Sequence, residues 1–442
     1  MQSELKPLVA IVGRPNVGKS TLFNRLIGRR SAIVSDVAGT TRDRVTADTE
    51  WAGRSFILVD TGGLELFPET DLWKQVKAQI DAAIDDADVI IMVVDCSVGA
   101  TPADRDVAQS LRRTRKRVIL AANKADNDTR TNSSLEFYEL GMGDPIPISA
   151  YHNLGIEDLI SNVVSSIDVR NEYIEPKADM RLAIVGRTNV GKSMLVNSIT
   201  GNSRSIVTNI PGTTRDALDT LIYHNGVSTL LIDTAGIRRR GSIEPGVERY
   251  SVLRAIRAID RADVAILILE APQLATSQDT HIAQFVLNAF KGIVIVVNKW
   301  DLASELGLNK EDALAKIRQR FKFIDYSPVC FTSALNKTGV SDVLNTAKCV
   351  YEEWTKGLPR YDLRRTVMNA ISEHPPSLTG KKSLKIYSVV QDHTGPPSFT
   401  FYVNRSDMVH FSYKRYLENS LRAVYEFKGS PLRMRFKGRG ER

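Results

Sequence analysis

Two stretches of the chain combine residue types and spacing suited to binding a phosphate chain. They are Gly13-Arg14-Pro15-Asn16-Val17-Gly18-Lys19-Ser20 and Gly186-Arg187-Thr188-Asn189-Val190-Gly191-Lys192-Ser193, which lie 173 residues apart. Both fit G-x-x-x-x-G-K-[ST], in which the glycines let backbone N–H groups approach a phosphate and the lysine adds a positive charge. An apolar run ends at each first glycine, which predicts a strand before each loop and a helix starting at each lysine.

Further short motifs follow each loop at nearly matched spacing. After the first loop come Thr40-Thr41-Arg42-Asp43, Asp60-Thr61-Gly62-Gly63-Leu64, Asn123-Lys124-Ala125-Asp126 and Ser149-Ala150. After the second come Thr213-Thr214-Arg215-Asp216, Asp233-Thr234-Ala235-Gly236-Ile237, Asn298-Lys299-Trp300-Asp301 and Ser333-Ala334. The offset grows from 173 at the aspartate motif to 175 and then 184, so insertions fall in the later loops, where they are tolerated.

Oxygen-bearing side chains in these motifs are suited to Mg²⁺, which prefers oxygen ligands and keeps several waters. The expected metal-binding residues are Ser20, Thr41, Asp60, Ser193, Thr214 and Asp233. The two threonines also lie where a loop could close over a γ-phosphate. We therefore expect them to act in catalysis together with Lys19, Lys192, Asn16 and Asn189.

The Asn-Lys-x-Asp motif predicts which base is bound. A carboxylate at Asp126 or Asp301 accepts hydrogen bonds from the N1–H and the 2-amino group of guanine, and adenine has neither donor. Because the wrong base leaves buried polar groups unpaired, the penalty for it is large. The sequence therefore predicts GTP and GDP as ligands and argues against an ATPase.

The residue after each aspartate motif raises a question about hydrolysis. Ras-like enzymes place a glutamine there to orient the attacking water, but Leu64 and Ile237 cannot hydrogen-bond a water. In related GTPases an asparagine at the place of Asn16 and Asn189 holds a K⁺ ion that neutralises charge as the β–γ bond breaks. We favour this role over the alternative, in which each asparagine only stabilises its own turn.

Short apolar runs alternate with longer, charged, helix-like segments through both halves. Continuous apolarity is typical of parallel strands buried on both faces, so we expect an α/β fold with two parallel sheets flanked by helices. Between residues 358 and 442 the order predicted is helix, strand, strand, helix, strand, an α+β unit. The predicted domains are 1–167 and 180–357, joined by a linker at 168–179, and a third at 358–442.

Composition restricts the setting of the chain. Its three cysteines show no metal-ligand or redox spacing, and its N-terminus is polar, so we expect a reducing compartment, the cytoplasm. No apolar stretch approaches the ~20 residues that cross a bilayer. The net charge of +8 lies in residues 361–442, which carry 15 Lys and Arg against 7 Asp and Glu. This excess is suited to a polyanion or simply to a solvated surface.

The full set of motifs resembles the tandem, double-Era-like GTPases called Der or EngA. The C-terminal segments Pro396–Asn404 and Tyr413–Asn419 resemble the K-homology-like domain of that family. The resemblance implies a GTP-hydrolysing switch in assembly of the large (50S) ribosomal subunit. It implies ribosomal RNA as partner, no DNA or membrane, and a monomer when free.

RNA contact remains less defined than the nucleotide sites. Nucleic-acid-binding K-homology domains clamp the backbone with a G-x-x-G loop, and none occurs in residues 358–442. The candidate RNA-binding residues are therefore Lys381, Lys382, Lys414, Arg415, Arg433 and Arg435, unless the domain mainly binds its own GTPase units. Arg238, Arg239 and Arg240 are either a second RNA contact or a solvated charge run.

Two other classes of function stay open. A modification or transport GTPase would require cysteine chemistry or membrane spans, which the sequence lacks. A binding module with inactive nucleotide sites is disfavoured by the intact Lys19, Lys192, Asp60 and Asp233.

Overall fold

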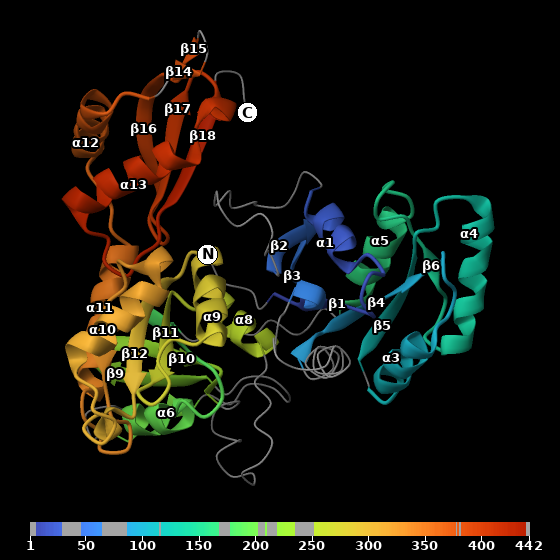
Figure 1. Cartoon of the computed structure of the whole chain (residues 1–442), viewed down its shortest axis with the longest axis horizontal. Coiled ribbons are helices and arrows are strands. Elements are labelled where there is room, and N and C mark those ends of the chain that lie inside the picture. The colour runs from blue at the N-terminus through green and yellow to red at the C-terminus, as the bar shows by residue number, and fades with distance from the viewer. Residues whose placement is uncertain are drawn as a thin grey trace. The chain divides into compact units, whose positions relative to one another are not determined.

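The structure is a computed structural model that describes residues 6–28, 46–63, 86–114, 116–167, 177–201, 208–209, 219–234, 252–376, 378–379 and 382–438. The chain divides into two compact units (Figure 1). The first comprises Met1–Ser35, Thr40–Glu175 and Ser251–Arg257, and the second comprises Asp36–Gly39, Pro176–Tyr250 and Ala258–Arg442. The finer domain boundaries given above stay predictions.

A six-stranded sheet in the order β2-β3-β1-β4-β5-β6 forms the centre of the first unit. Its strands are β1 (Leu8–Val12), β2 (Thr46–Trp51), β3 (Arg54–Asp60), β4 (Val89–Asp95), β5 (Arg117–Asn123) and β6 (Ile146–Pro147). The helices are α1 (Lys19–Ile27), η1 (Thr61–Gly63), α3 (Pro102–Arg112), α4 (Asp128–Ser133), η2 (Ser134–Leu140) and α5 (Ile156–Ser166). All neighbouring pairs except β2 and β3 are parallel.

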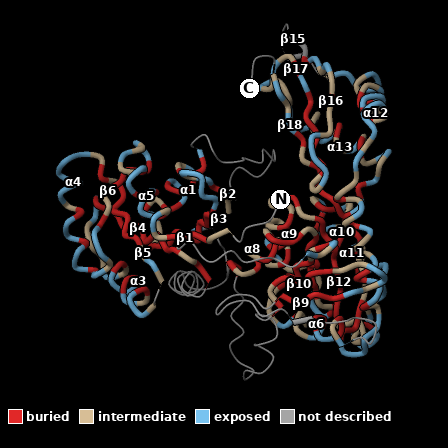
Figure 2. Tube along the Cα trace, turned by 180° about the vertical axis from the view of Figure 1, so that it is seen from behind, coloured by how far each residue is buried: buried red, intermediate tan, exposed pale blue. Residues whose placement is uncertain are grey.

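The sheet forms because its central strands are apolar on both faces. Every residue of β1 and β4 is buried, as Figure 2 shows. One face packs in a core with α1 and α5, through residues such as Leu22, Phe23 and Leu159. Helix α3 begins at a capping box in which the Thr101 side chain accepts from the Asp104 N–H. These helices fix the loops that leave the carboxyl ends of the strands.

The second unit repeats this arrangement in a seven-stranded sheet, β13-β12-β11-β7-β10-β9-β8. The strands are β7 (Met180–Val185), β8 (Thr208–Asn209), β9 (Thr220–His224), β10 (Val227–Ile232), β11 (Val264–Glu270), β12 (Gly292–Asn298) and β13 (Val329–Phe331). The helices are α6 (Lys192–Thr200), α9 (Ser277–Asn288), η4 (Trp300–Leu302), α10 (Lys310–Arg320), η5 (Lys322–Ile324) and α11 (Val340–Trp354). Helix α8 (Val252–Arg261) is divided between the two units after Arg257.

The expected parallel sheets flanked by helices are confirmed, and each sheet also carries antiparallel strands on one side. Strand β2 runs antiparallel to β3, and β8, β9 and β10 form an antiparallel ribbon. The sequence analysis did not predict β2 or β9. Residues 46–51 are half polar and mostly outside the core, so they give no continuous apolar signal.

A three-stranded sheet, β16-β17-β18, forms the C-terminal part of the second unit and confirms the α+β expectation. Its elements are α12 (Arg360–Glu373), β14 (Leu378–Thr379), β15 (Lys382–Ser383), β16 (Ile386–His393), β17 (Ser398–Val403), η6 (Ser406–Met408), α13 (Phe411–Tyr425) and β18 (Arg433–Gly438). Strands β16 and β17 are antiparallel, whereas β17 and β18 are parallel. Leu363 and Leu417 on the two long helices pack with Phe399 and Phe401 in a separate core.

This small domain is joined to the seven-stranded sheet by backbone hydrogen bonds. The Ile293 N–H donates to the Gly429 carbonyl at 2.8 Å, and the Gly429 N–H donates to Tyr326 at 2.9 Å. The Gly395 N–H donates to the Trp354 carbonyl at 2.9 Å, and Gly395 lies against the Trp354 ring. That ring, on a side chain 7% exposed, is held in the sheet part by its indole N–H, which donates to the Phe290 carbonyl at 2.8 Å. Backbone pairing and a buried aromatic ring therefore connect the two parts of this unit. Among the residues described, no helix is long and apolar enough to span a bilayer.

Candidate nucleotide sites

Both phosphate loops have the backbone conformation that their glycines predict. Gly13 and Gly186 have φ of 149° and 152°, and a Cβ there would come within 2.5 and 2.6 Å of the carbonyls of Val93 and Ile268. Gly18 has φ of 97°, and a Cβ on it would collide with the Asn123 amide. Glycine is therefore required both for the left-handed backbone and for close packing against neighbouring strands.

The loop lysines lie at the start of α1 and α6, as predicted. The Lys19 ammonium donates to the carbonyls of Gly13 and Arg14 at 2.9 and 2.8 Å, and Lys192 donates to those of Gly186 and Arg187. Burial lowers the pKa of Lys19, although the nearby Asp60 carboxylate opposes this effect. Each ammonium is thus held by backbone carbonyls of its own phosphate loop.

The asparagine of each Asn-Lys-x-Asp motif connects two loops. Asn123 donates to the Val17 carbonyl at 2.8 Å and accepts from the Ala150 N–H at 3.0 Å. Asn298 repeats both bonds, with Val190 at 2.9 Å and Ala334 at 3.0 Å. The phosphate loop, the base motif and the Ser-Ala motif therefore meet at one buried amide in each half.

The two aspartates that the sequence predicts to accept from guanine have different surroundings. Asp126 accepts from the Ser149 hydroxyl at 2.6 Å and from Arg130 at 2.7 Å. At the second site the residue four positions after Asp301 is Glu305, so no arginine occupies that place. Trp300 packs on Phe331 of the edge strand β13, with ring centroids 4.4 Å apart.

The two aspartates expected near Mg²⁺ also differ. Asp60, 2% exposed, is the last residue of β3 and accepts from the Gly62 N–H at 2.9 Å. Asp233 follows β10 with φ of 56°, and its N–H donates to Asp219 at 2.9 Å. Asp60 is buried and Asp233 is half-buried, and carboxylate oxygens of this kind are ligands that suit Mg²⁺. Within the described ranges, no cluster of three His, Cys, Asp or Glu forms a separate metal site.

Asn16 and Asn189 occupy equivalent exposed positions, with left-handed φ of 65° and 63°. Asparagine is among the few non-glycine residues that adopt this conformation readily. Several other predicted residues fall outside the described ranges, and these are Thr40–Asp43, Leu64, Thr213–Asp216, Ala235–Ile237, Arg238–Arg240 and Lys381. The side chain of Lys382 is likewise not described.

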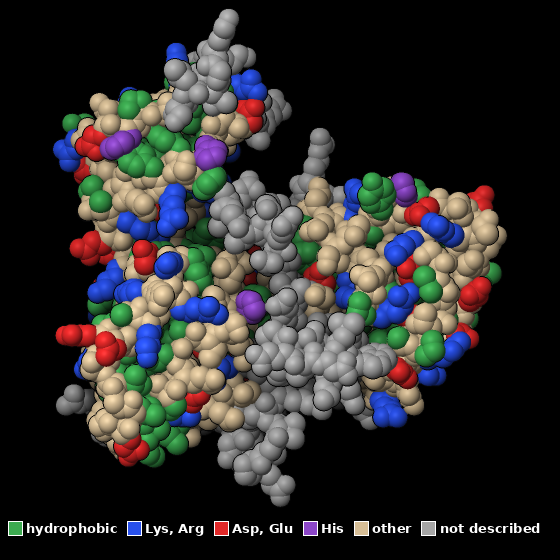
Figure 3. Space-filling view, in the orientation of Figure 1, with side chains coloured by type: hydrophobic (Ala, Val, Ile, Leu, Met, Phe, Trp, Pro, Cys, Tyr) green, Lys and Arg blue, Asp and Glu red, His purple; other side chains and the backbone are tan. Residues whose placement is uncertain are grey.

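The RNA-binding candidates are not equally available. Arg415 and Arg435 are exposed, and Lys414 is half-buried. Arg433 instead lies over the Phe290 ring at 4.4 Å, so it packs inside the second unit. Figure 3 shows basic side chains of the C-terminal domain interspersed with histidine and acidic residues on the face in view.

Cys330 is partly buried against the core of the second sheet, and its Sγ donates to the Thr346 hydroxyl at 3.3 Å. His374 follows α12 and meets the Tyr416 hydroxyl at 3.2 Å. Asp95 and Glu270, the last residues of β4 and β11, lie between the phosphate loop and the base motif of their half. No predicted motif contains them, so only their position at strand ends could have revealed them.

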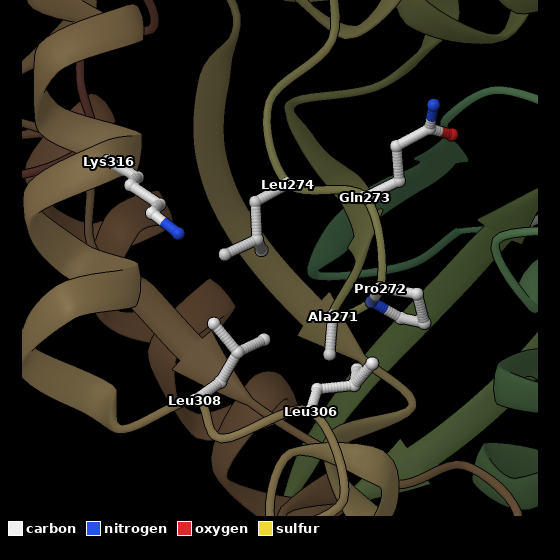
Figure 4. Close-up of a pocket in the computed structure, with 7 residues that line it drawn as sticks. All are labelled: Ala271, Pro272, Gln273, Leu274, Leu306, Leu308 and Lys316. Carbon is white, nitrogen blue, oxygen red and sulfur yellow. The ribbon is translucent and has the colours of Figure 1, made fainter.

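A cavity of about 350 Å³ opens near the second site. It is lined by Ala271, Pro272, Gln273, Leu274, Leu306, Leu308 and Lys316 (Figure 4). The three leucines converge on the cavity, whereas the Gln273 amide points away from it. None of these residues is a predicted nucleotide contact.

Comparison with known proteins finds family models that match three stretches of the chain. A family model described as 50S ribosome-binding GTPase matches residues 8–124 and 181–299. The KH-domain-like model of EngA bacterial GTPase enzymes matches residues 358–437. The solved structure of Aquifex aeolicus Era bound to GDP·AlF4⁻ covers 59% of this chain and 93% of its own, with 20% identity and a TM-score of 0.30.

Curated relatives match over nearly the full length. GTPase Der of Herpetosiphon aurantiacus is 47% identical, covering 99% of this chain and 97% of the relative. GTPase Der of Thermomicrobium roseum is 49% identical, covering 98% and 96%. With both phosphate loops, both base motifs and the C-terminal domain matched, the chain belongs to the GTPase Der family.

Proposed function

We propose that this GTPase is a cytoplasmic switch that uses two GTP sites to control its binding to the large ribosomal subunit during assembly. The observation that carries the proposal is the repeated geometry of the two phosphate loops beside an α+β domain matched by the KH-like model. Family models and relatives support a ribosomal role, and ribosomal RNA is the partner this role requires.

The proposed chemistry follows from the positions of the side chains. Loop N–H groups with Lys19 and Lys192 bind the phosphates, and Asp126 and Asp301 accept from guanine. Ser20 with Asp60, and Ser193 with Asp233, would hold Mg²⁺, with Thr41 and Thr214 completing the set. Bound Mg²⁺ would neutralise charge on the β- and γ-phosphates.

Potassium binding by Asn16 and Asn189 belongs to the same proposal. GTP turnover is expected to be faster in K⁺ than in Na⁺ at matched ionic strength, and Asn16→Ala should lower the response of the first site. Equal turnover in the two salts would leave the asparagines with a purely conformational role.

Sedimentation tests the ribosomal part. Cell extract containing the protein is centrifuged with GDP or a non-hydrolysable GTP analogue, and migration with 50S particles only in the analogue is expected. No migration with either nucleotide would reject the proposal. Arg415→Gln with Arg435→Gln should weaken migration, whereas the matched change Arg105→Gln, in the first unit, should not.

A further inference from the structure

A chain of charged side chains runs behind each nucleotide site. In the first site the Arg14 guanidinium lies between two acids: its Nε is 3.3 Å from Asp104 Oδ2 and its Nη2 is 4.0 Å from Asp95 Oδ2. Arg14 belongs to the phosphate loop, yet the groups it meets are acids at the ends of a strand and a helix. The arginine therefore connects the loop to the scaffold.

The second site repeats this connection, with a closer contact to the acid at the strand end and a slightly longer one to the acid on the helix. Arg187 Nη2 is 2.7 Å from Glu270 Oε1, and its Nε is 3.6 Å from Asp279 Oδ2. Arg187 also donates to the side chain and the carbonyl of Gln273, at 2.5 and 2.9 Å. The longer Glu270 side chain thus reaches its arginine, whereas Asp95 stays at 4.0 Å.

Asp104 and Asp279 are rigid anchors. Both are fully buried and occupy the third helical position of a capping box, where Thr101 and Thr276 donate to them. One carboxylate therefore caps a helix and also holds the arginine of a phosphate loop. Because a buried carboxylate is costly without a counter-charge, the neighbouring arginine helps to compensate the charge of Asp104 or Asp279.

The acids at the strand ends extend the chain to the base motif. Lys124 Nζ is 2.6 Å from Asp95 Oδ2, and Lys299 Nζ is 2.6 Å from Glu270 Oε2. Lys124 also donates back to the Asn16 carbonyl of the phosphate loop at 3.1 Å. Each acid is consequently shared between the loop that faces the phosphates and the loop that faces the base.

We propose that Arg14 with Asp95, and Arg187 with Glu270, are positioning residues that fix the spacing between the phosphate loop and the base motif. They would set the affinity of each site for the whole nucleotide without touching it, because a preorganised site loses less entropy on binding. This inference rests on the nucleotide sites proposed above. Because Arg187 lies closer to Glu270 than Arg14 does to Asp95, we expect a larger effect at the second site.

The experiment needs one site to be observed at a time. Asp126→Asn presents one acceptor and one donor, which match the N1–H and 2-oxo groups of xanthine instead of guanine. In that background fluorescent GDP reports the second site, and in Asp301→Asn it reports the first. Glu270→Gln is then compared with Glu305→Gln, an exposed acid near the same base motif.

We expect Glu270→Gln to speed GDP release about tenfold, which is about 1.4 kcal/mol. Asp95→Asn should give a smaller effect at the first site, and Glu270→Asp should be intermediate. GTP affinity should fall by the same factor while kcat stays unchanged, since only uniform binding is lost. A purely structural role would lower the melting temperature and leave the release rate as it was.

Two failures are distinguishable. If the parent background binds no guanine nucleotide, the proposed function is rejected. If it binds GDP but Glu270→Gln releases it as slowly as Glu305→Gln does, the positioning role is rejected and the proposed function stands.

Discussion

Replacing Asn123 with alanine tests how the first nucleotide site is held together. The side chain is 3% exposed and joins the Val17 carbonyl to the Ala150 N–H, at 2.8 and 3.0 Å. Truncation leaves both backbone groups buried without their partner. Each such group costs about 1–3 kcal/mol, so the free energy of local opening should fall by about 2–6 kcal/mol.

Amide hydrogen exchange measured by mass spectrometry gives the local opening free energy directly. Because 1.4 kcal/mol is tenfold, exchange at the phosphate loop and the Ser-Ala motif should accelerate at least about 30-fold. Asn298→Ala should do the same at the second site alone. Asn162→Ala is the control, because its exposed amide only donates to the Asp158 carbonyl at 2.9 Å.

The reasoning would be refuted if amide exchange at the phosphate loop were accelerated no more by Asn123→Ala than by Asn162→Ala. It would also fail if both units lost protection equally, since the described bonds of Asn123 all lie within the first unit. GDP release measured on the same samples links the local opening to the site.

Three further predictions concern charge, reactivity and packing. Burial raises the pKa of Asp95, but hydrogen bonds from Lys124 and Ser97 outweigh it, so the folded pKa lies below the unfolded value of about 3.9. The ionised Asp95 carboxylate therefore stabilises the folded state above about pH 4, and this contribution is lost as pH falls through the folded pKa. In urea denaturation the free energies of unfolding of the parent and Asp95→Asn should differ at pH 6 and converge on acidification. Burial raises the pKa of Cys96 to about 11, so a thiol reagent at pH 8 should label the exposed Cys349 before Cys96. Equal labelling rates of the two cysteines, measured by mass spectrometry, would contradict this. Trp354→Ala should destabilise the second unit by about 3–5 kcal/mol in denaturant unfolding, whereas Tyr361→Ala, with a side chain 75% exposed, should change it little.

Sequence patterns predicted the local structure of the two phosphate loops well because these loops depend on the backbone and on short fixed spacings. Gly13, Lys19 and Asn123 occupy their expected positions because a strand, a loop and a helix follow one another with no insertion. The helix starts at both lysines follow from the same rule.

The parts that sequence did not reveal depend on contacts between distant segments. Asp104 gives no signal beyond a helix cap, and its arginine partner lies 90 residues earlier. Strand β2 is polar, since it borders the sheet, and only its pairing with β3 makes it a strand. Arg433 was predicted as an RNA-binding residue from its charge, and only the fold shows that its guanidinium packs on the Phe290 ring.

One strand of the second unit bears two attachments. Near the start of β12 the Ile293 N–H donates to the Gly429 carbonyl of the C-terminal domain, and at its last residue the Asn298 amide donates to the Val190 carbonyl of the phosphate loop. Seven extended residues span about 20 Å and cannot shorten without breaking their ladder. The C-terminal domain and the second candidate nucleotide site are consequently attached to the two ends of one strand. A change in the tilt of β12 would therefore move both of them together.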